Sequence, residues 1–398
     1  MNGGDTAPRR RRIAIMLGTR PEALKLVPLI RALRQQPDRF ETWVIATAQH
    51  REMLDQVLSL FQIAPDVDLN LMRPNQTLAE LTGSVLEKVA RCLATERPDL
   101  VVVQGDTTTA FTSALAAFYA RIPIAHVEAG LRSRDLANPF PEEANRRLTA
   151  VVADIHLAPT PLARRRLLRE GVPRRKVVVS GNTIVDTLRG LLEGAVRPTP
   201  PVQWPFNGGR VLVVTSHRRE SWGHDLENIC RALRELVARF PDLVIVYPVH
   251  LNPNVREPVT RMLAGVERVH LISPLDYIGF VDLMRRAYVI LTDSGGIQEE
   301  GPTLGKPLLV LRKVTERPEA FRVGLAKLVG TDRESIVTQV GRLLTDPTAY
   351  HEMSTGINPY GDGRAAERIV EALTRWFDGQ RPLLHRAREF RPASLVMR

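Results

Sequence analysis

The sequence predicts an α/β protein with two domains, each a parallel sheet with helices on both faces. Short runs of β-branched residues, such as Leu100-Val-Val-Val103, alternate with longer segments of helical period along the whole chain. Such unbroken apolar runs are typical of strands buried on both faces. The alternation stops once, at residues 197–209, where four prolines and two glycines interrupt it. We expect a domain boundary there.

The expected elements follow in order from this pattern. In the first half, strands are expected at residues 13–17, 43–47, 100–103, 123–127, 155–158 and 177–179, and a helix at 21–35. In the second half, strands are expected at 211–214, 243–247, 269–272, 288–292 and 307–311, and helices at 334–344 and 363–377. The predicted organisation is an N-terminal domain (1–196), a C-terminal domain (210–362), a helix packing back across both (363–380) and a poorly ordered basic tail (381–398).

The composition excludes several classes of protein. The net charge is +11, but the arginines are spread over the whole length and aromatic residues make up only 5% of the chain, so no nucleic-acid partner is expected. No apolar run approaches the length of a membrane span. Cys92 and Cys230 lie far apart without CxxC spacing, which predicts neither a disulfide framework nor a zinc site. A soluble cytoplasmic protein is expected.

Polar motifs are expected at the carboxyl ends of the strands, where doubly wound sheets bind ligands. With two such domains, the sequence predicts a cleft between them. The first motif, Gly18 to Lys25, follows the first strand and opens a helix at Pro21. The amides of that helix start favour an anion, and Arg20 and Lys25 add positive charge.

Three carboxylates follow later strands of the first half, namely Asp106, Glu128 and Glu142. Crowded carboxylates raise one another's pKa, which suits general acid–base chemistry. Structural roles remain open for two of them. Asp106 has the position of a helix N-cap, and Glu142 can form an i,i+4 ion pair with Arg146, while Glu143 points elsewhere.

The second half places His217 and His250 after its first two strands. Structural and functional roles are nearly balanced for these histidines. Ser294, Gly295 and Gly296 follow a later strand, where the glycines let the backbone approach a diphosphate at a helix start. Glu300, one turn further, is expected to accept hydrogen bonds from sugar or ribose hydroxyls, and Arg317 to supply a cation to a phosphate.

Other cofactor and metal motifs are missing from the sequence. No GxGxxG follows a strand, and no HExxH or paired CxxC occurs. The segment Gly301 to Pro307 resembles a P-loop, but it is one residue short and has Pro in place of Ser or Thr. We therefore expect neither a bound cofactor nor a metal.

Nine motifs in this order resemble the non-hydrolysing UDP-N-acetylglucosamine 2-epimerases. They are GTRPEALK, TAQHREMLDQVL, QGDTTTAF, HVEAGLRS, PEEANRR, TSHRRES, YPVHLNPNV, LTDSGGIQEEGPTLGKP and TERPEAFR. The resemblance runs from about Ile13 to Ala372. It implies a GT-B-like fold of two Rossmann-like domains with the active site between them, and a homodimer.

The resemblance also assigns site residues. It implies catalytic roles for Asp106, Glu128, Glu142 and His217. Substrate contacts are implied for Arg20, Lys25, Asp106, Glu128, Arg146, His217, Phe280, Ser294, Gly295, Gly296, Glu300 and Arg317. Gln49, Gln76 and His250 match positions that bind a second, activating substrate molecule in some members. The sequence departs from some members at Leu275, where they have a Gln near the uracil, and at Asn75, where they have a basic residue.

The implied reaction is the reversible C2 epimerisation of UDP-N-acetylglucosamine to UDP-N-acetylmannosamine. Because no carbonyl acidifies the hydrogen at C2, we expect UDP to leave C1 first, giving 2-acetamidoglucal, before it adds back. A GT-B glycosyltransferase, an epimerase of a related UDP-2-acetamido sugar and a non-enzymatic nucleotide-sugar sensor remain alternatives. The three carboxylates disfavour the sensor, since they would repel a diphosphate.

Overall fold

The computed structural model describes residues 9–47, 51–71, 76–195, 204, 206 and 208–392. The chain divides into two compact units. The first unit comprises Met1–Thr187 with Gly361–Arg391, and the second comprises Leu188–Tyr360 with Pro392–Arg398. The predicted boundary, residues 197–209, lies mostly outside the described residues.

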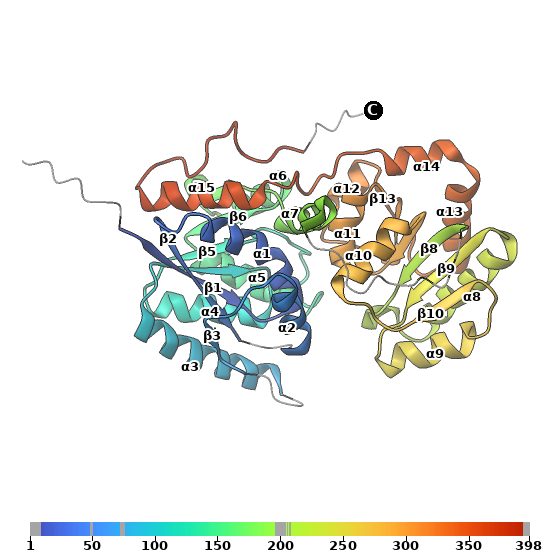
Figure 1. Cartoon of the computed structure of the whole chain (residues 1–398), viewed down its shortest axis with the longest axis horizontal. Helices are drawn as coiled ribbons and strands as arrows, with labels where there is room; N and C mark the ends of the chain where they lie inside the picture. The colour runs from blue at the N-terminus through green and yellow to red at the C-terminus, as the bar shows by residue number, and fades with distance from the viewer. Residues whose placement is uncertain are drawn as a thin grey trace, which may run out of the picture. The chain divides into compact units, whose positions relative to one another are not determined.

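The first unit contains a seven-stranded parallel sheet in the order β3-β2-β1-β4-β5-β6-β7 (Figure 1). Its strands are β1 (Arg11–Leu17), β2 (Phe40–Ala46), β3 (Val67–Asp68), β4 (Leu100–Gln104), β5 (Ile124–Val127), β6 (Ile155–Ala158) and β7 (Val177–Val179). Its helices are α1 (Arg20–Arg34), α2 (Arg51–Leu60), α3 (Leu78–Glu96), α4 (Thr108–Tyr119), α5 (Glu142–Val152), α6 (Pro161–Arg169) and α15 (Ala365–Phe377), with a 3-10 turn η1 (Arg174–Lys176). Helix α7 (Thr183–Gly190) runs across the unit boundary, and the short π-helix η2 (Leu191–Ala195) follows it in the second unit.

The second unit contains a six-stranded parallel sheet in the order β10-β9-β8-β11-β12-β13. Its strands are β8 (Arg210–Thr215), β9 (Leu243–Pro248), β10 (Val269–Ile272), β11 (Val289–Thr292), β12 (Leu308–Val310) and β13 (Ala326–Leu328). Its helices are α8 (His224–Arg239), α9 (Pro253–Leu263), α10 (Tyr277–Arg286), α11 (Gly295–Glu300), α12 (Glu319–Arg322), α13 (Arg333–Thr345) and α14 (Pro347–Ser354), with 3-10 turns η3 (Arg219–Ser221) and η4 (Gly301–Leu304).

The prediction of two parallel-sheet α/β domains is confirmed. Each expected strand is present with its ends shifted by at most three residues, because unbroken apolar runs such as β4 are buried along their full length. The two strands that the sequence reading missed, β3 and β13, are two and three residues long and carry too few residues for a pattern. In both sheets the strand order reverses beside the first strand. The reversal lies between β1 and β4 in the first unit and between β8 and β11 in the second.

The C-terminal segment belongs to the first unit. Helix α15, red in Figure 1, packs against α1. Beyond it the sequence predicts a poorly ordered tail, but residues up to Arg391 are compact. Leu383, Leu384 and Phe390 are buried, and the Phe390 amide donates to the Val179 carbonyl at 2.9 Å. These apolar side chains among the arginines supply the burial that holds the segment in place.

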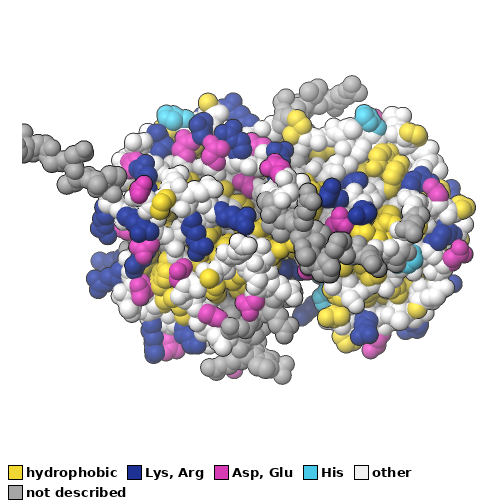
Figure 2. Space-filling view, in the orientation of Figure 1, with side chains coloured by type: hydrophobic (Ala, Val, Ile, Leu, Met, Phe, Trp, Pro, Cys, Tyr) yellow, Lys and Arg dark blue, Asp and Glu magenta, His cyan; other side chains and the backbone are white. Residues whose placement is uncertain are grey.

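Lys and Arg side chains are spread over the visible face of both units, interspersed with Asp and Glu (Figure 2). This distribution agrees with the even spacing of arginines along the sequence. In the part of the chain that the structure describes, no helix combines the length and apolar character needed to cross a bilayer.

Candidate functional site

In each unit, the predicted site residues gather where the strand order reverses. The loops after β1 and β4 carry Arg20 and Asp106, and the loops after β8 and β11 carry His217 and Ser294. At such a reversal the two adjacent connections leave toward opposite faces of the sheet and open a crevice at the carboxyl ends of the strands. This topology explains why residues far apart in sequence share one place in the fold.

Lys25 and Glu128 form a buried ion pair in the first unit. Lys25 lies on α1 and its Nζ is 2.6 Å from Oε1 of Glu128, which follows β5. Gln104, at the end of β4, donates to the other carboxylate oxygen. Glu128 has a φ of +66°, a left-handed conformation that a non-glycine residue adopts at a cost of about 1 kcal/mol. The strained backbone and the two donors together fix the direction of this carboxylate.

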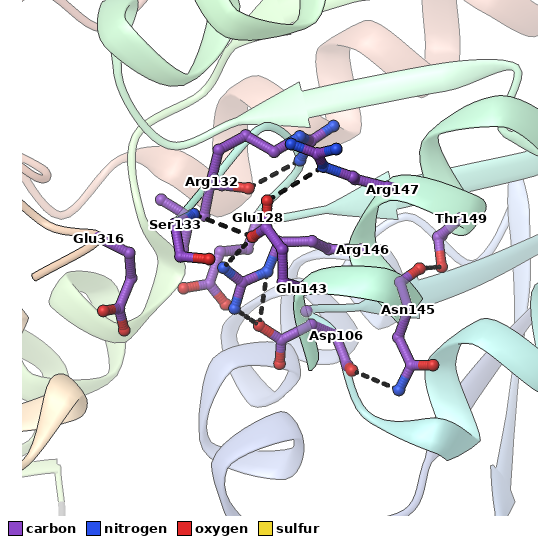
Figure 3. A network of polar contacts seen from close by, with 12 residues as sticks. Asp106, Glu128, Arg132, Ser133, Glu143, Asn145, Arg146, Arg147, Thr149 and Glu316 are labelled. Carbon is purple, nitrogen blue, oxygen red and sulfur yellow. Dashed lines mark hydrogen bonds and ion pairs between the residues drawn. The ribbon is translucent and has the colours of Figure 1, made fainter. Parts of the chain in front are cut away.

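Asp106 is held by α5 rather than used as a helix cap. The N-cap of α4 is Thr107, whose side chain accepts from the Ala110 amide, so the predicted capping alternative for Asp106 is wrong. Arg146 donates to Asp106 Oδ2 from Nε at 3.0 Å and also from Nη2, and Asn145 donates to the Asp106 carbonyl at 3.0 Å (Figure 3). The carboxylate remains partly exposed, at 27% of its side-chain surface, and a ligand can reach it.

The two acidic residues that open α5 differ in burial. Glu142 is half-buried at the first residue of the helix. Glu143 is fully buried, accepts from Arg146 Nη1 at 3.0 Å and from the Ser133 amide at 2.9 Å, and also contacts Arg147 (Figure 3). The prediction that Glu143 points elsewhere is therefore wrong, because residues three apart on a helix also share a face. Glu143 braces the arginine that holds Asp106.

Asp106 and Glu128 follow β4 and β5, which are neighbouring strands paired at Gln104 and Val127. A Cβ placed on Gly105, the residue before Asp106, would lie 3.7 Å from Glu128 Oε2. Both carboxylates face a cation, Arg146 and Lys25 respectively, which limits their mutual repulsion. The arrangement provides two acid–base groups at one sheet edge.

The amides at the start of α1 already have an anion, which the sequence analysis did not foresee. Glu22 Oε2 accepts from the Gly18 amide at 2.8 Å and from the Thr19 amide at 2.6 Å. Glu22 thus occupies the Gly18 and Thr19 amides, and a substrate anion at this helix start stays a prediction. The signal was present in the sequence, since a Thr followed three residues later by a Glu marks a helix start. Arg20 is half-buried at the first residue of the helix.

In the second unit, a buried aspartate organises the loop that carries His217. Asp293 Oδ2 accepts from the amides of His217 at 2.7 Å and Arg218 at 2.9 Å, and its Oδ1 lies 3.0 Å from His217 Nδ1. Burial by itself would raise the pKa of Asp293, but the contact with His217 and the two amides lower it below its ordinary value. In the sequence, Asp293 stands within the motif LTDSGGIQEE, and its type and place there predicted no role for it.

His217 also stacks on His250, with ring centroids 5.8 Å apart. Burial and the nearby His217 lower the pKa of His250, which favours the neutral ring. The Nδ1 of His217 faces Asp293, so its Nε2 is left to meet a ligand, and 41% of its side-chain surface is exposed. Asp293 and His217 thus have the geometry of an imidazole oriented by a carboxylate.

Gly295 and Arg317 fit together closely at the start of α11. A Cβ on Gly295 would lie 2.9 Å from Arg317 Nη1, so the glycine makes room for the guanidinium. Arg317 donates from Nε to Glu299 Oε1 at 2.7 Å and from Nη1 to Glu316. Two carboxylates thus fix the cation that the sequence analysis assigned to a phosphate.

The other predicted contacts of this unit lie on the same elements. Ser294 is the N-cap of α11 and leaves its hydroxyl out of the cap, and Gly296 follows it within the helix. Glu300 is buried and accepts from Tyr277 Oη at 2.6 Å, and Phe280 is half-buried on α10 with Tyr277.

The residues predicted for activation are only partly described. Gln49 and Asn75 lie outside the described residues, whereas Gln76 precedes α3 and is half-buried. Regulation through Gln76 and His250 stays a prediction. Within the described ranges, no group of three or more His, Cys, Asp or Glu side chains could hold a metal ion.

Comparisons with known proteins identify the family. The family model described as UDP-N-acetylglucosamine 2-epimerase matches residues 31–374. The UDP-N-acetylglucosamine 2-epimerase of Salmonella typhimurium is 53% identical over 369 residues, covering 91% of this chain and 98% of that protein.

Solved structures agree with this assignment. A crystal structure named as a UDP-N-acetylglucosamine 2-epimerase from Listeria monocytogenes superposes with a TM-score of 0.88 at 45% identity, covering 94% of this chain and 98% of that one. The Neisseria meningitidis enzyme bound to UDP-GlcNAc superposes with a TM-score of 0.84 at 46% identity, covering 92% and 100%. The resemblance seen in the sequence motifs is confirmed: the chain belongs to the UDP-N-acetylglucosamine 2-epimerase family.

Proposed function

We propose that this protein interconverts UDP-N-acetylglucosamine and UDP-N-acetylmannosamine by reversible epimerisation at C2. Relatives at about half identity carry the name of this enzyme, and one related structure holds UDP-GlcNAc. The observation in this chain that carries the proposal is the pair of carboxylates, Asp106 and Glu128, which follow neighbouring strands and are held by Arg146 and Lys25. Inversion at carbon needs two acid–base groups, one for each face of the sugar.

The chemistry requires UDP to leave first. No carbonyl acidifies the C2 hydrogen, so direct removal of this proton would face a very high barrier. Breaking the C1–O bond places the electron pair on UDP and gives C1 cationic character, which acidifies the neighbouring C–H bond. A carboxylate then takes the C2 proton and leaves neutral 2-acetamidoglucal. Addition of a proton to the opposite face of C2 and of UDP to C1 completes the inversion.

Residues of both units serve these steps in the proposed mechanism. Arg20, His217, the α11 start at Ser294–Gly296 and Arg317 stabilise the charge on the departing diphosphate, each preorganised donor contributing about 3 kcal/mol. Asp106 and Glu128 exchange protons with C2, and Glu142 assists. Glu300 accepts hydrogen bonds from hydroxyl groups of the substrate, and Phe280 also contacts the substrate. Lys25 and Arg146 hold the two carboxylates in place.

Incubation with UDP-N-acetylglucosamine in heavy water tests the proposal. Deuterium at C2 in both epimers, read by NMR, supports elimination and readdition. Inversion without solvent deuterium contradicts the mechanism, and the absence of any product without an acceptor points to a glycosyltransferase.

Asp106→Asn and Glu128→Gln are each expected to lower turnover at least about a hundredfold, the usual scale for acid–base groups. Turnover close to wild type in either variant removes that residue from the mechanism.

We also propose that two copies of the chain pair through an apolar stripe on α4 and α5. Phe118, Leu148 and Val151 are 54%, 47% and 82% exposed, and α4 packs against α5. In the proposed dimer these side chains lie on one outward surface. An identical patch on a second copy would cover it in a two-fold dimer.

The paired variant Phe118→Glu/Val151→Glu is expected to shift the light-scattering mass from dimer to monomer. Ile357→Glu, at an equally exposed apolar side chain of the second unit, serves as the control and is expected to keep the dimer. A wild-type monomer at micromolar concentration would contradict the pairing.

Both cysteines are free thiols, which suits a reducing compartment, so we place the reaction in the cytoplasm.

A further inference from the structure

Glu22 is a buried carboxylate to which the proposed mechanism assigns no role. It is 2% exposed and lies at the third residue of α1. Oε2 accepts from the Gly18 and Thr19 amides, and Oε1 lies 2.5 Å from the hydroxyl of Thr107, a residue 85 positions further along the chain. Among the described residues, no cation makes a hydrogen bond or ion pair with it. A carboxylate buried without a cation is costly, so its retention calls for a reason beyond helix capping.

These bonds join the two loops at the strand reversal of the first unit. Gly18 and Thr19 connect β1 to Arg20, while Thr107 follows Asp106 directly. Thr107 also accepts from the Ala110 amide at 3.0 Å, so a single hydroxyl links Glu22 to the start of α4. The same loops meet at a second point, where a Cβ on Gly18 would come within 2.5 Å of Thr109 Oγ1. The loops are therefore fitted to each other, and Glu22 is their polar connection.

The second unit shows the same device at its own strand reversal. Asp293, which follows β11, accepts from the amides of His217 and Arg218 in the loop after β8. In both units a buried carboxylate from one loop of the reversal binds groups of the other loop. Elsewhere in the first unit, Glu80 occupies the equivalent helix position after Thr77 and binds its own helix start while exposed to solvent. Helix capping by itself is thus achieved without burial.

We propose that Glu22 is a positioning residue that sets Arg20 and Asp106 in fixed relation to each other by holding the Thr107 hydroxyl. This inference rests on the proposed function, in which Arg20 meets the diphosphate and Asp106 the sugar. Glu22 itself touches neither. Reacting groups must be held within a fraction of an ångström of their productive geometry. If the link between the loops is loosened, we therefore expect kcat to fall by a larger factor than substrate affinity.

Steady-state kinetics of four variants test the proposal. Glu22→Gln and Thr107→Val are each expected to lower kcat about tenfold with KM changed less than about twofold. Because both remove the same link, the double variant is expected to lose no more than either single variant. Thr107→Ser keeps the hydroxyl and is expected to retain wild-type kcat. Glu80→Gln, the matched change at the other helix start, is expected to leave kcat unchanged.

Hydrogen exchange measured on the same variants gives a readout that does not depend on activity. Glu22→Gln is expected to speed amide exchange across residues 105–111, far from it in sequence, whereas Glu80→Gln does not. Unchanged exchange there, a kcat equal to that of Glu80→Gln, or losses that multiply to about a hundredfold in the double variant would each overturn the proposal. A wild-type protein without epimerase activity would instead refute the proposed function, and the exchange data would still decide the role of Glu22.

Discussion

Replacement of Glu22 by Gln should remove a pH-dependent term from the stability of the first unit. Burial raises the pKa of this carboxyl from 4.5 to about 7, outweighing the bonds from Thr107, Gly18 and Thr19 that favour the charged form. A shift of this size corresponds to about 3 kcal/mol. Because the folded-state pKa is the higher one, the stabilisation is fully present below about pH 4.5 and is lost as the pH rises through about 7.

Thermal unfolding of both proteins at about pH 5 and about pH 8 measures this term. About 2.5 kcal/mol of the change falls between these two values. For a unit of this size, each kcal/mol moves the melting temperature by roughly 2–4 °C. The melting temperature of Glu22→Gln minus that of wild type should therefore rise by about 5 °C or more from about pH 5 to about pH 8.

The difference between the two proteins cancels other groups that titrate in this range. Burial raises the pKa of Asp186 to about 6 and lowers that of His126 to about 4, and both are common to variant and wild type. A melting-temperature difference that is the same at both pH values would refute the assignment of a raised pKa to Glu22. The inference about loop positioning would then stand on geometry alone.

Two further substitutions probe the second unit. Asp293→Asn keeps the size of the side chain but removes the charge that faces His217 and brings an amide group toward the donors, so kcat should fall about a hundredfold. The control Asp332→Asn, at the N-cap of α13, should leave kcat unchanged. Equal kcat in the two variants would contradict the orienting role of Asp293. Gly295→Ala should displace the Arg317 guanidinium and raise KM about tenfold, and combination with Arg317→Ala should add nothing; additive losses would show that Gly295 acts in another way.

Much of the architecture could be predicted from the sequence because it depends on local patterns. Unbroken apolar runs marked the strands, and polar motifs directly after them marked Asp106, Glu128 and His217. What stayed hidden were contacts between distant segments. Nothing near Glu22 in the sequence reveals that its carboxylate meets Thr107, and nothing near Arg146 reveals that its guanidinium reaches Asp106. Such partners are set by strand order, which determines which loops become neighbours.

The capping alternative for Asp106 is a second case in which local sequence could not decide between two roles. An aspartate just before a helix is a good N-cap by its residue type, and so is the threonine that follows it. Only the structure distinguishes them, because Thr107 takes the cap and leaves the aspartate to Arg146. When two adjacent residues suit a helix cap equally well, their contacts with distant segments decide which of them takes that role.

The first unit draws on both ends of the chain, with α15 against α1 and Phe390 bonded to β7. During synthesis, the ribosome must therefore complete the whole second unit before the first can close its apolar surface under α15. All seven strands of the first sheet are made by then, but the unit has to wait with that surface uncovered, which is the condition under which nascent chains engage chaperones or aggregate. Shortening the gene from its 3′ end would thus harm the half of the enzyme that is made first.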